Sequence, residues 1–202
     1  MITPPIEKLL TVMNQKGYRV YNTPSIDWNI NIVGIRNKNL IPDKFDDTLI
    51  VFNNFLDHWH ISYYPITTDP SVFYLKNPVN SKGTAILLEG QYKGVYKIDK
   101  HNNRYHALCQ RLADVSVYRD NDKNGSLKLN TDTIETGRFG INIHKGPKNG
   151  NWGTDNNAAY SAGCQVFADS RHFNEFMNKC RNGEKSFGNK FTYTLLNEKD
   201  FD

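Results

Sequence analysis

The 202-residue sequence lacks several features that would assign it to a specialised class of protein. Its three cysteines include no Cys-x-x-Cys pair and no Cys/His spacing typical of zinc sites, which gives no support for a disulfide framework or a structural zinc site. No apolar run approaches the roughly 20 residues of a membrane-spanning helix, so no membrane association is expected. Basic residues are scattered despite a net charge of +4, and without a dense basic stripe nucleic acid is not an expected partner.

The N-terminal residues also lack a targeting signal. In MITPPIEKLL no basic segment precedes a long apolar one, so we expect no signal peptide. We therefore expect synthesis in the cytoplasm, with action elsewhere after release or non-classical export. The composition, 38% hydrophobic and 12% aromatic, is globular, and the length favours a single domain over 1–202. We expect a monomer that needs no cofactor.

Hydrophobic periodicity predicts a mostly β, α+β domain with a helix near each end of the chain. Residues 6–16 have helical spacing and end at Gly17, and residues 170–182 place four apolar side chains on one face, with Ser170 as the candidate N-cap. A third, short helix is predicted over 104–112. Strands are predicted at 18–23, 28–37, 47–55, 58–68, 83–98 (two strands and a turn), 115–120, 138–144 and 190–196. Cys109 and Cys180 lie in these periodic stretches and are predicted to be small core residues.

The residues best suited to chemistry flank one long polar loop, in GINIHKGPKNGNWGTDNNAAYSAGCQVF at 140–167. His144 ends one apolar run and Cys164 begins the next. If these runs are adjacent strands, the histidine can accept the thiol proton and stabilise the thiolate. Gly163 would admit a close substrate, N–H groups around Gly163 and Cys164 would face an oxyanion, and Ser161 would bond the histidine or its backbone. Spacing alone still favours the alternative of a buried structural cysteine and a strand histidine.

A resemblance supports the catalytic interpretation. INIHKG followed by SAGC resembles the signature of L,D-transpeptidase catalytic (YkuD-like) domains, in which a strand ending in His-x-Gly precedes a variable loop and Ser-His-Gly-Cys. The matching residues are His144, Gly146, Ser161, Gly163 and Cys164. The resemblance implies an L,D-transpeptidase-like β-sandwich or mixed sheet. The segments NIVGIRN, ITTDP, VYRD and FGINIH are further similar to small single-domain proteins of phages and prophages.

Two positions depart from the family pattern. Ala162 replaces the second histidine, and Val166 replaces the arginine that usually follows the cysteine by two positions. A guanidinium matches a substrate carboxylate well, so another arginine would have to take this role. The candidates are Arg36, Arg138 and Arg171.

The resemblance implies that the substrate is the peptide stem of peptidoglycan. Cys164 would attack a stem carbonyl to form a thioester, and His144 would accept the thiol proton and return it to the leaving amine. Gly146 and Trp152 are the further expected substrate contacts. We favour hydrolysis by a phage-type lytic peptidase. The alternatives are an L,D-transpeptidase that cross-links stems and a non-catalytic wall-binding or virion-associated protein on the same scaffold, which Ala162 and Val166 favour.

Two metal sites were considered and are disfavoured. His58 and His60 alternate in HWH, as in some zinc sites, but no further ligands are evident. Asp120–Gly125 begins like a calcium loop, yet Thr131 stands at the twelfth position where glutamate is required. A polar turn is the favoured interpretation of this segment, and no metal is expected.

Overall fold

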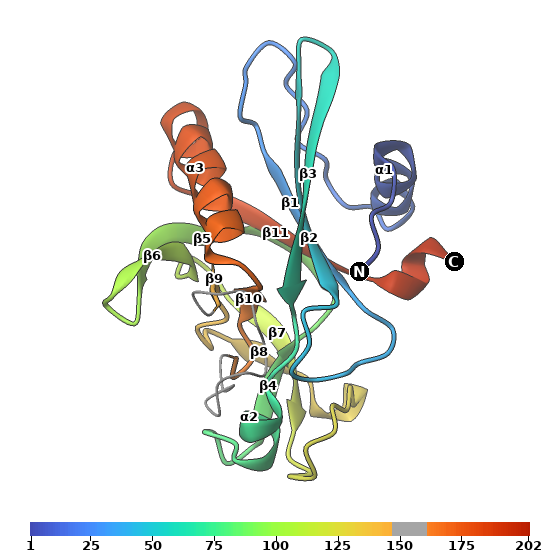
Figure 1. The fold of residues 1–202 in the computed structure, drawn as a ribbon, viewed down its shortest axis with the longest axis vertical. Coiled ribbons are helices and arrows are strands. Elements are labelled where there is room, and N and C mark those ends of the chain that lie inside the picture. The colour runs from blue at the N-terminus through green and yellow to red at the C-terminus, as the bar shows by residue number, and fades with distance from the viewer. Residues whose placement is uncertain (147–160) are drawn as a thin grey trace.

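The computed structural model describes residues 1–146 and 161–202, and its main element is a closed eight-stranded barrel (Figure 1). The strand order around the barrel is β1-β11-β5-β6-β9-β10-β3-β2. Their bounds are β1 Asn31–Arg36, β2 Asp47–Phe55, β3 His58–Thr67, β5 Gly90–His101, β6 Tyr105–Gln110, β9 Ile143–Lys145, β10 Gln165–Phe167 and β11 Phe191–Asn197.

Two neighbouring pairs in the barrel are parallel and the others are antiparallel. The parallel pairs are β1 with β11 and β9 with β10. A parallel pair needs a crossover connection, and for β9 and β10 this is the chain between Lys145 and Gln165. The polar loop of the sequence therefore joins two adjacent strands whose C-terminal ends lie at the same edge of the barrel.

A second, three-stranded sheet of order β4-β7-β8 lies beside the barrel, at the lower end of Figure 1. Its strands are β4 Thr84–Leu87, β7 Val115–Asp120 and β8 Glu135–Gly137, and the short helix α2 Val72–Lys76 lies next to it. Apolar side chains of β4 and β7 belong to the same buried cluster as the barrel interior. The two sheets thus share one core.

The helices lie on different sides of the barrel (Figure 1). α1, Ile6–Gln15, buries Leu9, Val12 and Met13 against β1 and β2, and the chain turns away at Gly17, whose φ of 67° suits a glycine after a helix. α3, Ser170–Phe187, buries the predicted apolar face, including Cys180, in the main core. Its N-cap is Asp169, whose side chain accepts from the Arg171 N–H, rather than Ser170. The one-turn helices η1 Thr131–Thr133 and η2 Glu198–Phe201 complete the chain.

The mostly β, α+β class with a helix near each chain end is confirmed, but the main sheet closes into a barrel and does not form a sandwich. Three local predictions are also wrong. Residues 104–112 contain strand β6, because pairing with β5 outweighs the helical spacing. Residues 18–23 form no strand, and within 138–144 only the end joins β9.

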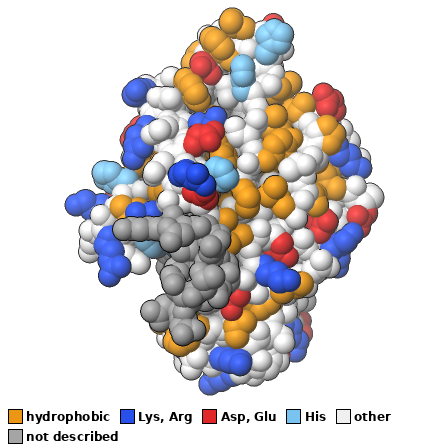
Figure 2. Space-filling model, viewed as in Figure 1, with side chains coloured by type: hydrophobic (Ala, Val, Ile, Leu, Met, Phe, Trp, Pro, Cys, Tyr) orange, Lys and Arg blue, Asp and Glu red, His pale blue; other side chains and the backbone are white. Residues whose placement is uncertain are grey.

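None of the described helices combines the length and the apolar character needed to cross a bilayer. Lys and Arg side chains are dispersed over the face shown in Figure 2, as the scattered charges of the sequence indicate.

Candidate active site

The register of β9 against β10 places Cys164 and His144 on the same face of two adjacent strands. Val166 pairs with His144, and the Gln165 N–H donates to the Asn142 carbonyl at 2.8 Å. Paired residues of neighbouring strands point to the same face, and side chains alternate along each strand. Cys164, opposite Asn142, therefore shares a face with His144, while Ile143 and Phe167 point into the core. The predicted adjacency is confirmed.

A tight turn before β10 fixes the cysteine backbone. Ser161 is fully buried, and its Oγ accepts from the Gly163 N–H at 3.1 Å and donates to the Cys164 carbonyl at 2.8 Å. Gly163 has a φ of 123°, and a Cβ there would lie 2.4 Å from the Ala85 carbonyl oxygen of β4. Ser161 thus holds the turn and does not bond His144, and Gly163 is required by packing against the second sheet.

Cys164 is partly buried, and its thiol interacts with backbone groups. Its Sγ donates to the Gly140 carbonyl at 3.5 Å and accepts from the Asn142 N–H at 3.4 Å. Burial raises its pKa to about 11, partly offset by the hydrogen bond from Asn142. The cysteine is therefore a neutral thiol at neutral pH.

His144 is buried and held in one tautomer. Its Nδ1 lies 2.9 Å from the Lys145 carbonyl oxygen, which can only accept, so Nδ1 carries the proton and Nε2 keeps its lone pair. Burial, and secondarily the neighbouring His101, lowers its pKa to about 4, whereas the hydrogen bond to Lys145 raises it. At neutral pH this imidazole is uncharged and able to accept a proton at Nε2.

The structure contains no hydrogen bond between Cys164 and His144, so the expected thiolate–imidazolium pair is not formed in this state. Both groups are neutral because both are desolvated, and desolvation disfavours each charged form. The register makes the two residues diagonal positions of the strand pair, and neither residue is among the groups that shift the pKa of the other.

His101 and Asn142 belong to the same cluster and were not identified from the sequence. The His101 ring stacks on His144 with 4.2 Å between ring centroids. Asn142 Oδ1 accepts from the Gln110 N–H at 3.0 Å, so its amide nitrogen is the group that donates to His101 Nδ1, also at 3.0 Å. Asn142 stands two residues before His144, an alternation that would have indicated a shared face. No sequence signal connects His101 to the site, because it comes there through the pairing of β5 with β6 and of β6 with β9.

Cys164 lines a cavity of about 400 Å³ between the barrel and the second sheet. Two arginines line it as well. Arg138, predicted from the sequence, is exposed and donates to the carbonyls of Arg111 and Leu112. Arg119, which the sequence analysis did not select, is nearly buried, pairs with Glu135 at 2.8 Å and lies 4.6 Å from the Phe139 ring centroid. The cavity thus places two cations near the thiol.

The other two candidate arginines lie elsewhere. Arg36 is fully buried and does not line this cavity. It pairs with Glu89 at 2.8 Å and Asp69 at 3.3 Å, and donates to Thr68, so its position indicates a structural role and a substrate contact is not supported. Arg171 is exposed at the start of α3 and pairs with Asp169.

The remaining predicted positions contribute packing or fall outside the described residues. Gly146 lies where a Cβ would meet the Phe167 carbonyl oxygen at 2.2 Å, so it allows close strand packing and no substrate role is evident. Val166 is fully buried and Ala162 is exposed at the cavity. Trp152 lies outside the described residues.

The described part of the chain holds no cluster of three or more His, Cys, Asp or Glu side chains able to bind a metal. His58 and His60 are exposed on β3. In the predicted polar turn, Asp120 accepts from backbone N–H groups of Asp122 and Lys128, which occupy its oxygens.

Comparison with known proteins gives no relative: no family model, curated protein or solved structure matches this chain.

Proposed function

We propose that the protein is a cysteine peptidase that cleaves the peptide stems of peptidoglycan. The observation that carries the proposal is the parallel pairing of β9 and β10, whose register puts Cys164 and His144 on one face. Cys164 lines a cavity there, and His144 does not. The resemblance of the INIHKG and SAGC segments to L,D-transpeptidase domains supports the choice of substrate.

The neutral state of both groups favours proton transfer during attack over a resting ion pair. Cys164 Sγ bonds to the substrate carbonyl carbon as its proton passes to His144 Nε2, which requires the imidazole to come within hydrogen-bond reach when substrate binds. The imidazolium then protonates the leaving amine, and a thioester remains. Attack by water on the thioester releases the acid and regenerates the thiol.

The arginines of the cavity offer a site for a stem carboxylate. Arg138 is exposed at the cavity, and Arg119 is held at its wall by Glu135. Because guanidinium groups bind carboxylates with paired hydrogen bonds, these two residues are the candidates for the role of the family arginine that Val166 replaces. His101 and Asn142 act as positioning residues for His144 and for the Cys164 strand.

The test is incubation of the purified protein with defined muropeptides, both single stems and cross-linked dimers, followed by mass spectrometry. We expect shortened stems or separated dimers, and no products with Cys164→Ala. Formation of new cross-links without cleavage would instead identify a transpeptidase.

A second candidate is a non-catalytic wall-binding protein, and the raised pKa of Cys164 and the missing Cys164–His144 hydrogen bond favour it. In that case the wild type and Cys164→Ala bind insoluble wall material equally and neither releases fragments. Turnover is therefore the deciding measurement, because a neutral resting thiol labels slowly under both candidates.

A further inference from the structure

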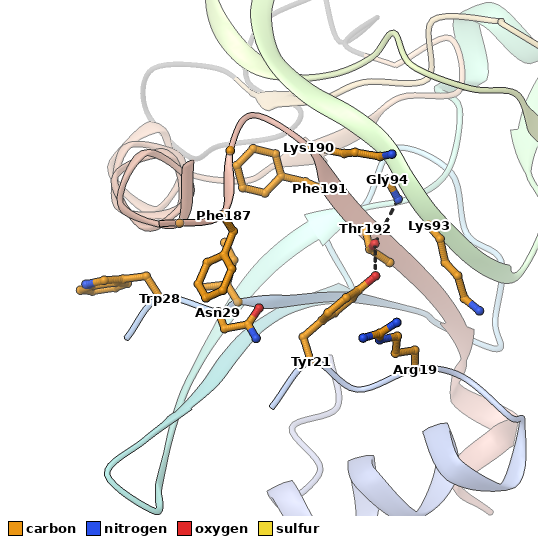
Figure 3. Close-up of a pocket in the computed structure, with 13 residues that line it drawn as sticks. Arg19, Tyr21, Trp28, Asn29, Lys93, Gly94, Phe187, Lys190, Phe191 and Thr192 are labelled. Carbon is orange, nitrogen blue, oxygen red and sulfur yellow. Dashed lines mark hydrogen bonds between the residues drawn. The ribbon is translucent and has the colours of Figure 1, made fainter. Parts of the chain in front are cut away.

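A second cavity, of about 440 Å³, lies between residues 19–30, the C-terminal end of α3 and the start of β11 (Figure 3). Its volume falls within the range of about 300–1,000 Å³ typical of small-molecule sites. It shares no lining residue with the Cys164 cavity. Any ligand bound here would occupy a different part of the surface from the proposed catalytic centre.

Three cations from separate segments line the cavity: Arg19, Lys93 and Lys190. All three are exposed, and none forms an ion pair with a carboxylate in the described parts of the chain, whereas Arg111, by contrast, is paired with Asp99. The described lining includes no Asp or Glu. Unneutralised cations beside a concave surface attract anions, so the cavity has the field of an anion-binding site.

Aromatic side chains form the opposite end of the cavity, where Figure 3 shows Trp28 and Phe187 away from Arg19 and Lys93. Trp28 has a φ of 67°, a left-handed conformation that is unusual and strained for a bulky residue. Its backbone is held by the Asp27 side chain and by the N–H of Ile30. The chain thus accepts strain at a residue that lines the cavity.

Polar contacts fix the centre of the cavity. The Thr192 hydroxyl lies 2.8 Å from the Tyr21 hydroxyl and accepts from the Gly94 N–H at 3.1 Å. A Cβ at Gly94 would lie 2.2 Å from Cε of Lys190, so any larger residue would displace the lysine. The position of Lys190 therefore depends on a glycine with a φ of 61° on the neighbouring strand.

We propose that this cavity binds an anionic saccharide, with the sugar ring at the Trp28–Phe187 end and a carboxylate or phosphate at the cationic end. The requirement for an anionic, ring-containing ligand follows from the cavity alone. The choice of a saccharide among such ligands rests on the proposed function in the cell wall.

The test is calorimetric titration of full-length Cys164→Ala protein, which cannot turn over substrate. The ligands are N-acetylmuramic acid, N-acetylglucosamine 6-phosphate, neutral N-acetylglucosamine and adenosine monophosphate. We expect at least one acidic sugar to bind about tenfold more tightly than the neutral sugar, which is the affinity gain that one charged hydrogen bond provides. Added salt should weaken this binding. The acidic sugar that binds more tightly shows whether the site prefers a carboxylate or a phosphate group. Equal affinity for the neutral sugar, tighter binding of the nucleotide, or no binding would overturn the proposal.

Matched variants locate the binding. Lys190→Gln removes one cation, and Trp28→Asn removes the ring with a residue that tolerates a positive φ. Each should weaken binding about tenfold, while Lys100→Gln, an exposed cation of β5 outside the cavity, should not. Binding unaffected by both cavity variants would contradict the location. Saccharide binding without muropeptide cleavage would refute only the peptidase, and cleavage without saccharide binding would refute only this site.

Discussion

The two cavities use ionisable groups in opposite ways. At the Cys164 cavity, burial raises the pKa of Cys164 to about 11 and lowers that of His144 to about 4, so both are uncharged. At the second cavity, Arg19, Lys93 and Lys190 are exposed and keep their charge. Burial thus keeps both groups of the proposed catalytic pair neutral, whereas the exposed cations provide a standing field for an anion.

The largest expected effect is that of Cys164→Ala, which should abolish cleavage at one cavity and leave saccharide binding at the other unchanged. Cys164→Ala removes the nucleophile, so muropeptide cleavage should fall by about 10³-fold or more, while saccharide affinity is unchanged. Cys109→Ala is the control, because Cys109 is a buried core residue bonded to the Asp99 carbonyl. Equal loss of cleavage in both variants would mean that the activity depends on stability and not on the Cys164 thiol.

The turn beneath Cys164 can be compared with an open turn near the second cavity. Gly163→Ala should lower the free energy of unfolding by about 3–5 kcal/mol, because its Cβ would meet Ala85 at 2.4 Å and its φ is 123°. Gly188→Ala should cost about 1–3 kcal/mol, because its φ of 80° and ψ of 169° are essentially restricted to glycine but no neighbour lies within 4 Å. Urea denaturation measures both. Equal costs would show that strain alone, without the contact to Ala85, explains the glycine.

Burial of neutral His144 predicts a pH dependence of stability. The unfolded histidine takes up a proton below pH 6.5, but the folded one does so only near pH 4, so stability falls as the pH drops between these values, by about 3 kcal/mol. The His144 contribution should be absent in His144→Gln, whereas His101, whose pKa burial also lowers, adds a slope of the same sign in both proteins. Asp47 and Asp69 contribute a slope of the opposite sign, because burial raises their pKa values to about 6 and about 8. This contribution is the same in both proteins and cancels when their profiles are compared. Identical pH profiles of the wild type and His144→Gln would show that folded His144 takes up its proton at the same pH as the unfolded chain.

The smallest effect concerns Arg138. If it binds a stem carboxylate, the wild type should prefer a stem with a free terminal carboxylate over its amide by about fivefold, and Arg138→Gln should lose that preference. Arg171→Gln is the control, since that residue is exposed and pairs with Asp169. Steady-state KM values for both peptides provide the measurement, and a preference retained in Arg138→Gln would assign the role to Arg119.

The sequence pointed to candidate-site residues only where a reactive side chain lies next to a recognisable local pattern. His144 and Cys164 flank one loop between apolar runs, which suggested adjacent strands, and the structure adds that the two strands are parallel. His101 lies 43 positions before His144 and carries no local signal, since it arrives through β5–β6 pairing. The same pairing made residues 104–112 a strand where periodicity indicated a helix.

The sequence by itself determined the α+β character, both terminal-region helices and the segment that joins β9 to β10, because these depend on local periodicity and on residues close along the chain. Only the tertiary structure decided that the main sheet closes into a barrel, that Arg36 is a buried ion-pair partner and that Arg119 lines the cavity of Cys164. Closure, burial and the resulting protonation states depend on contacts between distant segments, and desolvation by those contacts sets the charge of each group.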